Sequence, residues 1–420
     1  MDDGSLAGDV LAGEGLRKIH YSERIMPTLA ALASRFASER PFDGMTIAAC
    51  LHVTAETAVL ARVLRAGGAR VSLAASNPLS TQDDIAAALS SCDGVSVHAA
   101  AGEGRETYYS HIARIAGSGP DLVIDDGGDL VSTIHKAPPA RMPLGGVEST
   151  ATGVLRLRRM VAEGALGFPV IAASDTPAKR LVDDRHGTGQ SVIDGLIRAS
   201  GILLAGKTVV LAGFGTCGTG IAECARGLGA RVVITEVDPV RALDAALRGF
   251  RVLPLADAAP LGEVFITATG SADVITAEHM TLMPDGAILA NAGHFDVEID
   301  VRGLEGLAVA VEFNVRRYAD AYELPDGRRL LLLAEGRVVN LVAAGGHPPE
   351  VMDLAFGIEA LSLAWLARNA EKLSADVYPV PPDIDAEAAR LMLAALGAGT
   401  DTLTDAQRAY LASWQRSPRP

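Results

Sequence analysis

Short apolar runs alternate with segments of helical periodicity along most of the chain. A parallel strand that is buried on both faces needs a continuous apolar run, and polar residues or glycine follow such runs here. Strands are expected at residues 45–51, 70–74, 121–125, 209–212 and 231–235, and in short runs that end at Thr267 and Asn291. Helices are expected within residues 15–40, 85–89, 240–247 and 350–369, the last of them amphipathic. The alternation predicts an α/β fold with two Rossmann-like, doubly wound domains.

A glycine turn after the strand at 209–212 is the most informative local motif. Gly213, Gly215 and Gly218 have the spacing of a dinucleotide-binding turn, which needs glycine for the tight turn, for backbone approach to a pyrophosphate and for close helix packing. Glu236 ends the next strand about 20 residues later, where a carboxylate accepts hydrogen bonds from the adenosine ribose. Because a carboxylate repels a 2′-phosphate, NAD is favoured over NADP. The alternative is a nucleotide-free Rossmann-like domain with a structural glycine turn.

Polar residues also follow the strand expected at 45–51. Ligands bind at the carboxyl ends of strands in open α/β sheets, and His52, Thr54 and Glu56 stand at such an end. Thr54 and Glu56 suit a helix-capping pair equally well. The segment therefore predicts either part of a binding site or a helix start.

Three further segments indicate how the domains are arranged. Carboxylates surround a Gly-Gly turn at residues 125–129, which suits a catalytic site, a divalent-cation loop or turn chemistry alone. Residues 145–153 predict a helix start rich in Ser and Thr. The polar segment 174–191 and the glycine-rich segment 340–348 predict two crossovers between domains. We therefore expect a discontinuous first domain, residues 1–180 with 350–385, and a nucleotide-binding domain at 190–346.

Composition limits the possible partners. The chain has 420 residues, 49% of them hydrophobic, which is enough for two cores. A net charge of −14 argues against binding to nucleic acid or to an anionic membrane, so a small-molecule substrate is expected. The first residues lack a signal-peptide pattern and no apolar run of about 18 residues occurs, so a cytoplasmic protein is expected. The four cysteines have no metal-ligand spacing and are expected to be small buried hydrophobes, without disulfide or metal.

Taken together, these segments resemble the S-adenosyl-L-homocysteine hydrolase (adenosylhomocysteinase) family in its shorter form, over nearly the whole chain. The resemblance rests on residues 52–60, 80–83, 125–129, 187–191, 213–218, 235–239, 291–298 and 346–348. It implies substrate and NAD domains hinged near residues 175–189 and 346–351, a C-terminal oligomerisation segment at 386–420 and a homotetramer. It also implies an adenine nucleoside substrate and NAD that stays bound.

The chemistry implied by the resemblance is oxidation of the nucleoside 3′-hydroxyl, followed by removal of the C4′ proton and loss of the 5′ substituent. A ketone at C3′ acidifies the C4′–H bond, because the enolate delocalises the charge. By resemblance, Lys179 assists removal of the 3′-hydroxyl proton and Asp183 orients it. Asp126 handles the C4′ proton, while His52 and His294 lie near the 5′ leaving group or the attacking water.

The resemblance also implies the binding residues. The expected substrate-binding residues are Thr54, Glu56, Thr57, Gln82, Ser149, Thr150, His347, Met352 and Phe356. The expected cofactor-binding residues are Gly213, Gly215, Thr216, Cys217, Gly218, Glu236, Thr267, Asn291 and Asn340. Of these, Thr54, Glu56 and His347 would hold the adenine edge, and Asn340 would contact the nicotinamide amide.

Several positions depart from the family pattern. The family's Glu-Glu-Thr reads Glu148-Ser149-Thr150, so a carboxylate expected to bind a ribose hydroxyl is replaced by a short hydroxyl. Other departures are Ser174 for Asn, Val182-Asp183-Asp184 for Phe-Asp-Asn, His186 for Tyr and Asp84 for His. A site that hydrogen-bonds a sugar hydroxyl rejects analogues that leave its polar groups unpaired, so these changes predict a changed sugar.

Three functions follow. The favoured one is a nucleoside 4′,5′-dehydratase, in which the same enolate expels water. The alternative is S-adenosyl-L-homocysteine hydrolase, which gives adenosine and homocysteine. The third is an inactive NAD-bound scaffold.

Overall fold

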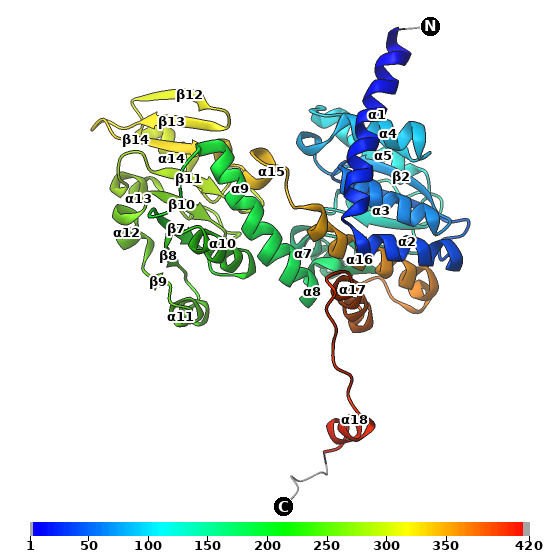
Figure 1. The fold of residues 1–420 in the computed structure, drawn as a ribbon. Coiled ribbons are helices and arrows are strands. Elements are labelled where there is room, and N and C mark those ends of the chain that lie inside the picture. Colours follow the sequence, from blue (N-terminus) through cyan, green and yellow to red (C-terminus); the bar gives the residue numbers. More distant parts are fainter. Residues whose placement is uncertain (1–2, 415–420) are drawn as a thin grey trace, which may run out of the picture.

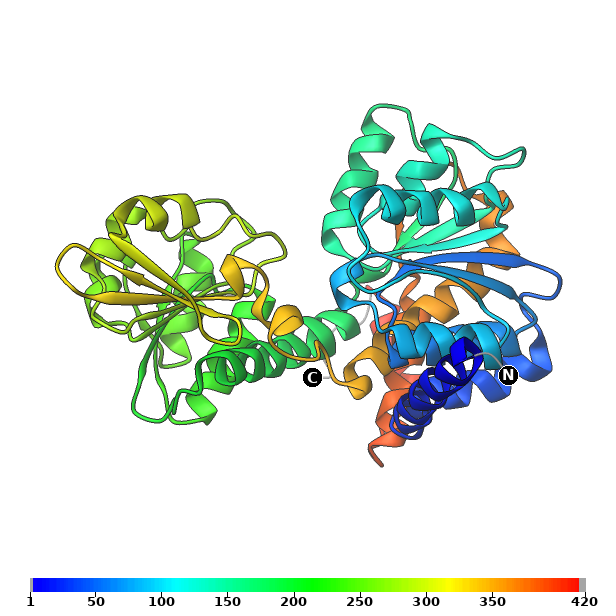
Figure 2. The same ribbon diagram turned by 90° about the horizontal axis from the view of Figure 1, so that it is seen from above.

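The computed structural model describes residues 3–414, with side chains from residue 9 onward, and forms two lobes around separate β-sheets (Figure 1). The first lobe combines the N-terminal part of the chain with helix α16 (Pro349–Asn369) and the segment that follows it. Helix α9 (Thr188–Ser200) runs from one lobe to the other, as seen from above in Figure 2. The predicted α/β class with two Rossmann-like domains is confirmed.

The sheet of the first lobe has seven parallel strands in the order β15-β6-β5-β4-β1-β2-β3. Its strands are β1 (Thr46–Leu51), β2 (Arg70–Ala75), β3 (Ser96–His98), β4 (Leu122–Asp125), β5 (Gly145–Glu148), β6 (Val170–Ala172) and β15 (Val377–Pro379). Alternate residues of β1 face opposite cores: Ile47 packs with helices α2, α3, α4 and α16, whereas Ala48 packs with α5 and α6. Because both faces are covered, the central strands β1 and β4 are largely apolar.

The helices of the first lobe connect these strands. They are α1 (Asp3–Arg24), α2 (Pro27–Glu39), α3 (Ala55–Ala66), η1 (Pro78–Ser80), α4 (Asp83–Cys92), α5 (Arg105–Gly117), α6 (Asp129–Lys136), α7 (Ala151–Ala162), η2 (Ala173–Asp175), α8 (Pro177–Lys179), η3 (Arg180–Gly187), α16, η6 (Ala370–Lys372) and α17 (Pro382–Ala395). Helix α18 (Asp405–Leu411) stands apart from the lobe (Figure 1). The last six residues of the expected C-terminal segment lie outside the described residues, as do the first two of the chain.

The second lobe has an eight-stranded sheet in the order β12-β13-β14-β11-β10-β7-β8-β9. Its strands are β7 (Thr208–Ala212), β8 (Arg231–Thr235), β9 (Arg251–Val252), β10 (Val264–Thr267), β11 (Ile288–Asn291), β12 (Ala310–Arg316), β13 (Ala319–Glu323) and β14 (Arg329–Leu333). Its helices are α9, α10 (Thr216–Gly227), α11 (Pro239–Leu247), α12 (Leu255–Ala258), η4 (Ala259–Leu261), α13 (Ala277–Leu282), α14 (Val301–Leu307), η5 (Ala334–Gly336) and α15 (Val339–Val342). Among the described strands, only β12–β13 and β13–β14 pair in antiparallel fashion.

In each sheet the parallel strands have one point at which the strand order reverses direction. In the first lobe it lies between β1 and β4, and in the second between β7 and β10. The loops after such neighbouring strands diverge, which leaves a crevice where ligands bind. The two reversal points therefore locate the candidate site in each lobe.

The lobes meet closely where the crossover η3 passes α10. A Cβ added at Gly220 of α10 would lie 1.8 Å from the Arg185 carbonyl oxygen, and one at Gly189 would lie 2.7 Å from the Gly220 carbonyl oxygen. Side chains are excluded from this crossing, so the backbones touch. The contact brings the first turn of α10 near the segment that follows Lys179.

Three local expectations were wrong in whole or in part. The helix start rich in Ser and Thr is present at Thr150, which caps α7, but residues 145–148 form strand β5. Gly146 lacks an apolar side chain because an added Cβ would lie 2.6 Å from Val123 Cγ2 on neighbouring β4, so no apolar run marks this strand. Helix α16 is buried nearly all round, and not amphipathic, because it lies between the sheet and helices α2, α3 and α17. Cys92 is exposed at the end of α4. None of the described helices has both the length and the apolar character needed to cross a membrane.

Candidate active site

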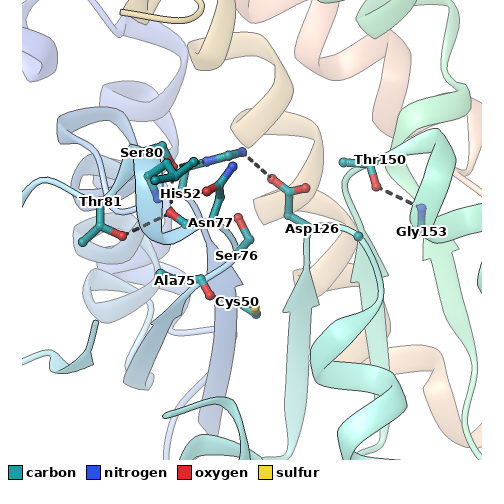
Figure 3. A network of polar contacts seen from close by, with 12 residues as sticks. Cys50, His52, Ala75, Ser76, Asn77, Ser80, Thr81, Asp126, Thr150 and Gly153 are labelled. Carbon is teal, nitrogen blue, oxygen red and sulfur yellow. Dashed lines mark hydrogen bonds and ion pairs between the residues drawn. The ribbon is translucent and has the colours of Figure 1, made fainter. Parts of the chain in front are cut away.

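His52 and Asp126 face each other at the reversal point of the first sheet (Figure 3). His52 follows β1 and Asp126 follows β4, two neighbouring parallel strands. The His52 Nε2 atom lies 3.3 Å from Asp126 Oδ2, while Nδ1 is held by the Ser80 hydroxyl. With both nitrogens engaged, the ring is fixed in orientation and can pass a proton along the line to Asp126.

Two buried carboxyls support this corner from below. Asp125 and Glu148 are paired across β4 and β5, and both are fully buried. Glu148 Oε1 accepts hydrogen bonds from Gly127 N, Thr150 N and Thr150 Oγ1, so it fixes the turns on either side of Asp126. Burial raises the pKa of Asp125 to about 7, although N–H groups of Val131 and Leu130 oppose the shift. Burial, followed by repulsion from Asp125, also raises the pKa of Glu148.

Lys179 and Asp183 form a buried ion pair on the crossover. Lys179 Nζ lies 3.1 Å from Asp183 Oδ2, and Asp183 Oδ1 lies 3.1 Å from Nδ1 of His347. The other His347 nitrogen is 3.3 Å from Thr188 Oγ1. The segment η3 is π-helical, and this wider turn, which recurs at functional sites, carries Asp183.

The charges in this pair stabilise each other. Burial alone would lower the pKa of Lys179, but the carboxylates of Asp183 and Asp184 outweigh it and raise the pKa. Burial alone would raise the pKa of Asp183, but Lys179 and His347 outweigh it and hold that pKa well below its usual range. Lys179 is therefore an ammonium group, suited to stabilise negative charge on a neighbouring oxygen.

Glu359 is a site residue that the sequence analysis missed. It lies in the middle of α16, is 1% exposed, and has an Oε2 atom without a hydrogen-bond partner among the described residues. Burial raises its pKa to about 8, while the Ser149 hydroxyl and Lys179 act in the opposite direction. A Glu within an otherwise apolar helix was the available signal, since an unpaired carboxyl is rarely buried without a reason.

Several expected substrate-binding residues lie near the carboxyl ends of the strands of the first sheet, and each makes a different kind of contact. Thr54 stands at the start of α3 without capping it through its side chain, so the helix-cap alternative is wrong for this residue. Glu56 accepts a hydrogen bond from Ser22, and Thr150 caps α7 through Gly153 N. Three others are covered or partly covered: Thr57 and Phe356 are buried, and Met352 packs against the core. Gln82 is half-buried at the start of α4.

The glycine turn of the second lobe has the geometry of a dinucleotide site. Gly213 has a φ of 98°, and a Cβ there would lie 2.5 Å from the Ala268 carbonyl oxygen. A Cβ at Gly218 would lie 2.1 Å from the Gly213 carbonyl oxygen, so both positions require glycine. At Gly215 the nearest atom is Arg241 Nη1 at 3.6 Å, which leaves room for a ligand.

A cavity of about 310 Å³ opens beside this turn. It is lined by Gly215, Thr216 and three arginines, Arg185, Arg241 and Arg248. Positive charge next to the N-terminus of α10 suits a pyrophosphate. A larger cavity of about 410 Å³ lies elsewhere in the lobe, and its carboxylates Glu305, Asp320 and Glu335 would repel one.

The remaining cofactor residues line the second reversal point. Glu236 accepts hydrogen bonds from the backbone N–H groups of Phe214, Val237 and Asp238, and so sits directly at the turn. Asn340 donates to Ser191 while its buried Oδ1 lacks a partner among the described residues, which fits a carboxamide donor such as that of nicotinamide. Thr267 donates to Asn291 Oδ1, and both side chains are fully buried.

Two expected site residues behave differently. Cys217 at the start of α10 lies near Asp184 and Lys179, and burial followed by the Asp184 charge raises its thiol pKa to about 11. It is therefore a neutral thiol that links the glycine turn to the crossover. His294, by contrast, is exposed on the loop after β11, where its ring contacts Phe295. Nothing in the described structure places it beside His52.

Three departures from the family pattern lie outside the two catalytic pairs. Asp84 forms an ion pair with Lys18 of α1, with 2.7 Å between Nζ and Oδ2, and thus joins two helices. Val182 packs against the core, and His186 is exposed. Two departures lie beside the catalytic residues: Asp184 Oδ1 is 3.8 Å from Lys179 Nζ, and Ser149 lies near the Glu359 carboxyl.

Comparison with known proteins gives consistent matches over both lobes. Residues 7–143 match the family described as S-adenosyl-L-homocysteine hydrolase, and residues 184–346 match its NAD binding domain. The chain is 53% identical to adenosylhomocysteinase of Aquifex aeolicus over 407 residues, which covers 96% of this chain and 97% of the relative. The corresponding enzyme of Saccharolobus solfataricus is 51% identical, with the same coverage.

Two further matches define the limits of the similarity. S-inosyl-L-homocysteine hydrolase of Methanopyrus kandleri is 49% identical over 407 residues, covering 96% of each chain. Among solved structures, a dipicolinate synthase from Bacillus halodurans has a TM-score of 0.50 at 16% identity, covering 78% of this chain and 99% of that one. At that identity the likeness concerns the fold alone.

Proposed function

The chain belongs to the S-adenosyl-L-homocysteine hydrolase family, and we propose that it hydrolyses S-adenosyl-L-homocysteine to adenosine and homocysteine with bound NAD. The family membership and the NAD-binding domain provide the frame. The observation that carries the proposal is two pairs of side chains in one lobe, the half-buried His52 with Asp126 and the buried Lys179 with Asp183. One unit suits proton transfer, and the other suits stabilisation of charge on a sugar oxygen.

The second lobe holds the cofactor through the glycine turn and the arginine-lined cavity. When bound, NAD accepts the hydride from C3′ of the nucleoside and later returns it. Asn340 would hold the carboxamide through its unpartnered Oδ1, and Glu236 would hold the adenosine ribose. The residues present therefore fit the cofactor.

The chain's own residues account for the steps at the sugar. The 3′-hydroxyl proton passes to Lys179 Nζ as Nζ gives a proton to the Asp183 carboxylate, and both transfers reverse when C3′ is reduced. The Lys179 ammonium stabilises negative charge on the 3′ oxygen during this transfer and then in the enolate. Asp126 takes the C4′ proton, and His52 delivers a proton to the departing sulfur. Water then adds to C5′ of the 4′,5′ double bond while C4′ regains a proton, and reduction at C3′ gives adenosine. Asp183 keeps Lys179 charged and in place throughout.

The hydrolase is better supported than the dehydratase. The relatives at 49–53% identity that we compare are all hydrolases of a nucleosyl homocysteine. The sugar-site argument for a dehydratase depended on a lost carboxylate, and Glu359 supplies a carboxyl beside Ser149. Dehydration remains a defined outcome of the test, as does an inactive scaffold.

The test is incubation of the purified NAD-bound protein with S-adenosyl-L-homocysteine, followed by assay of free thiol. In a parallel reaction, adenosine replaces S-adenosyl-L-homocysteine as the substrate. Mass spectrometry of the product then shows whether one water has been lost. Thiol release at a rate far above that of Lys179→Ala supports the hydrolase. Loss of water without thiol release would establish the dehydratase, and neither product would establish the scaffold.

The base is proposed to be adenine, with Thr54, Glu56 and His347 near its edge. One relative acts, by its name, on the inosyl compound, so S-inosyl-L-homocysteine is the informative competitor. A kcat/KM higher for the adenosyl substrate supports adenine. A preference for the inosyl substrate would overturn that part of the proposal.

A homotetramer forms part of the proposal. Helix α18 extends away from the lobe, and Leu411 and Trp414 are 70% and 91% exposed there (Figure 1). Apolar side chains on a projecting segment suit burial against another copy. Light scattering of the eluted protein should give four chains per particle, and removal of residues 396–420 should lower that number.

A further inference from the structure

Glu359 lies among the groups that we propose act on the sugar, so the inference drawn from it rests on the proposed function. The side chain comes from α16, whereas its charged neighbours Lys179, Asp126 and Asp183 come from α8, the loop after β4 and η3. Glu359 is shielded from solvent, with only 1% of its surface exposed. Charged groups from three other elements therefore act on the carboxyl.

Two oxygens in this cluster have no partner among the described residues. Glu359 Oε2 and Ser149 Oγ are both covered from solvent, and neither makes a hydrogen bond of ordinary geometry there. The Ser149 hydroxyl is nevertheless close enough to act on the Glu359 carboxyl. Buried polar atoms without partners are rare and costly, so adjacent ones suggest a group that binds there in the working state.

Ser149 connects Glu359 to the sugar site. It stands at the carboxyl end of β5, and its backbone N–H donates to the Asp125 carbonyl oxygen, which fixes its main chain beside Asp126. Ser149 as a whole is half-buried, so rotation about its single χ1 bond can carry the hydroxyl to the surface of the site.

We propose that Glu359 and Ser149 act together to select the nucleoside sugar, with Ser149 contacting the 2′-hydroxyl and Glu359 orienting Ser149 from behind. The roles of the neighbouring residues indicate which sugar hydroxyl Ser149 contacts. Lys179 interacts with the 3′ oxygen and Asp126 with the C4′ hydrogen. C2′ is the other carbon bonded to C3′, so its hydroxyl is the one left for Ser149. Glu359 is thus a positioning residue, and its role is specificity instead of proton transfer in the reaction.

The test compares adenosine with 2′-deoxyadenosine on NAD-bound protein. Formation of reduced nicotinamide reports oxidation at C3′, and calorimetry reports binding of each nucleoside independently of turnover. The native protein should favour adenosine in both measurements. Glu359→Gln should reduce that preference by about tenfold, because the amide replaces the carboxyl that orients the Ser149 hydroxyl and a hydrogen bond contributes about that factor.

Asp353→Asn is the matched control. Asp353 is a buried carboxyl on the same helix, but its oxygens accept from Thr28 N and Leu29 N at 2.8 Å, away from the sugar residues. This variant should lose stability and keep the adenosine preference. The double variant Ser149→Glu with Glu359→Gln moves the carboxylate to position 149 and should restore the preference lost in Glu359→Gln.

The outcomes separate the two proposals. If the native protein oxidises no nucleoside, the proposed function fails and this inference with it. If it oxidises adenosine but Glu359→Gln and Ser149→Ala keep the native preference, only the sugar-selection role is overturned. A fall in preference in both single variants, with no fall in Asp353→Asn, supports it. Should Glu359→Gln not fold, Ser149→Ala and the double variant decide the question.

Discussion

Lys179 Nζ lies 3.1 Å from Asp183 Oδ2, and both side chains are buried. Lys179→Ala should therefore lower thiol release by about 100- to 10,000-fold, the range typical for removal of a group that handles protons or charge at the reacting centre. Bound NAD should remain, since Lys179 belongs to the other lobe. Quantification of nucleotide in the purified variant is the control, and retained turnover would contradict the role.

Asp126→Asn should separate oxidation from elimination. Because Lys179 and the cofactor site are untouched, addition of adenosine should still give reduced nicotinamide. Thiol release from S-adenosyl-L-homocysteine should fall by about 100-fold or more, because the acceptor for the C4′ proton is lost. Stopped-flow absorbance followed by thiol assay measures both. An equal loss of both steps would argue against a role confined to the C4′ proton.

Two glycines of the cofactor turn predict different defects. Gly213→Ala should lower the free energy of unfolding by about 1–3 kcal/mol, because its φ of 98° strains any other residue and the Cβ meets Ala268. Gly215→Ala has room for its Cβ and should fold normally while binding NAD more weakly. Thermal unfolding and NAD titration distinguish them. Normal NAD affinity in Gly215→Ala would place the pyrophosphate elsewhere.

Glu359 predicts how stability depends on pH. Its pKa is raised from 4.5 to about 8, so between these values the folded protein holds a proton that the unfolded chain has lost. The free energy of unfolding should therefore fall as pH rises through this window. Asp125, raised from 3.8 to about 7, adds a loss of the same sign. Glu359→Gln should flatten the upper part of the decline in urea unfolding experiments, and an unchanged slope would contradict the shift.

The fold was largely predictable because local rules and tertiary structure agree in its strands. Apolar runs such as Val209–Ala212 are buried on both faces, so period and length alone identify them. Strand β5 was missed because two of its four residues are glycines, and glycine is needed at position 146 because Val123 on the neighbouring strand occupies the space of a side chain. Helix α16 was assigned correctly as a helix but not in burial, since no local pattern shows what will cover it.

The candidate site was predictable where its residues follow strands and much less so elsewhere. His52 and Asp126 meet because β1 and β4 are neighbours, and that pairing follows from the fold. Glu359 and its contact with Ser149 depend on how a distant helix crosses the sheet. Asp84 appeared to change the sugar site, but its ion pair with Lys18 is visible only in three dimensions.

Hydrogen exchange at C4′ tests the central claim most directly, because every step depends on a C4′–H bond made acidic by oxidation at C3′. The NAD-bound protein would be incubated with adenosine in deuterium oxide, and the recovered nucleoside analysed by NMR. We predict deuterium at C4′ with the native protein and none with Asp126→Asn. Thiol release from S-adenosyl-L-homocysteine by a protein that leaves the C4′ hydrogen unexchanged would contradict the account.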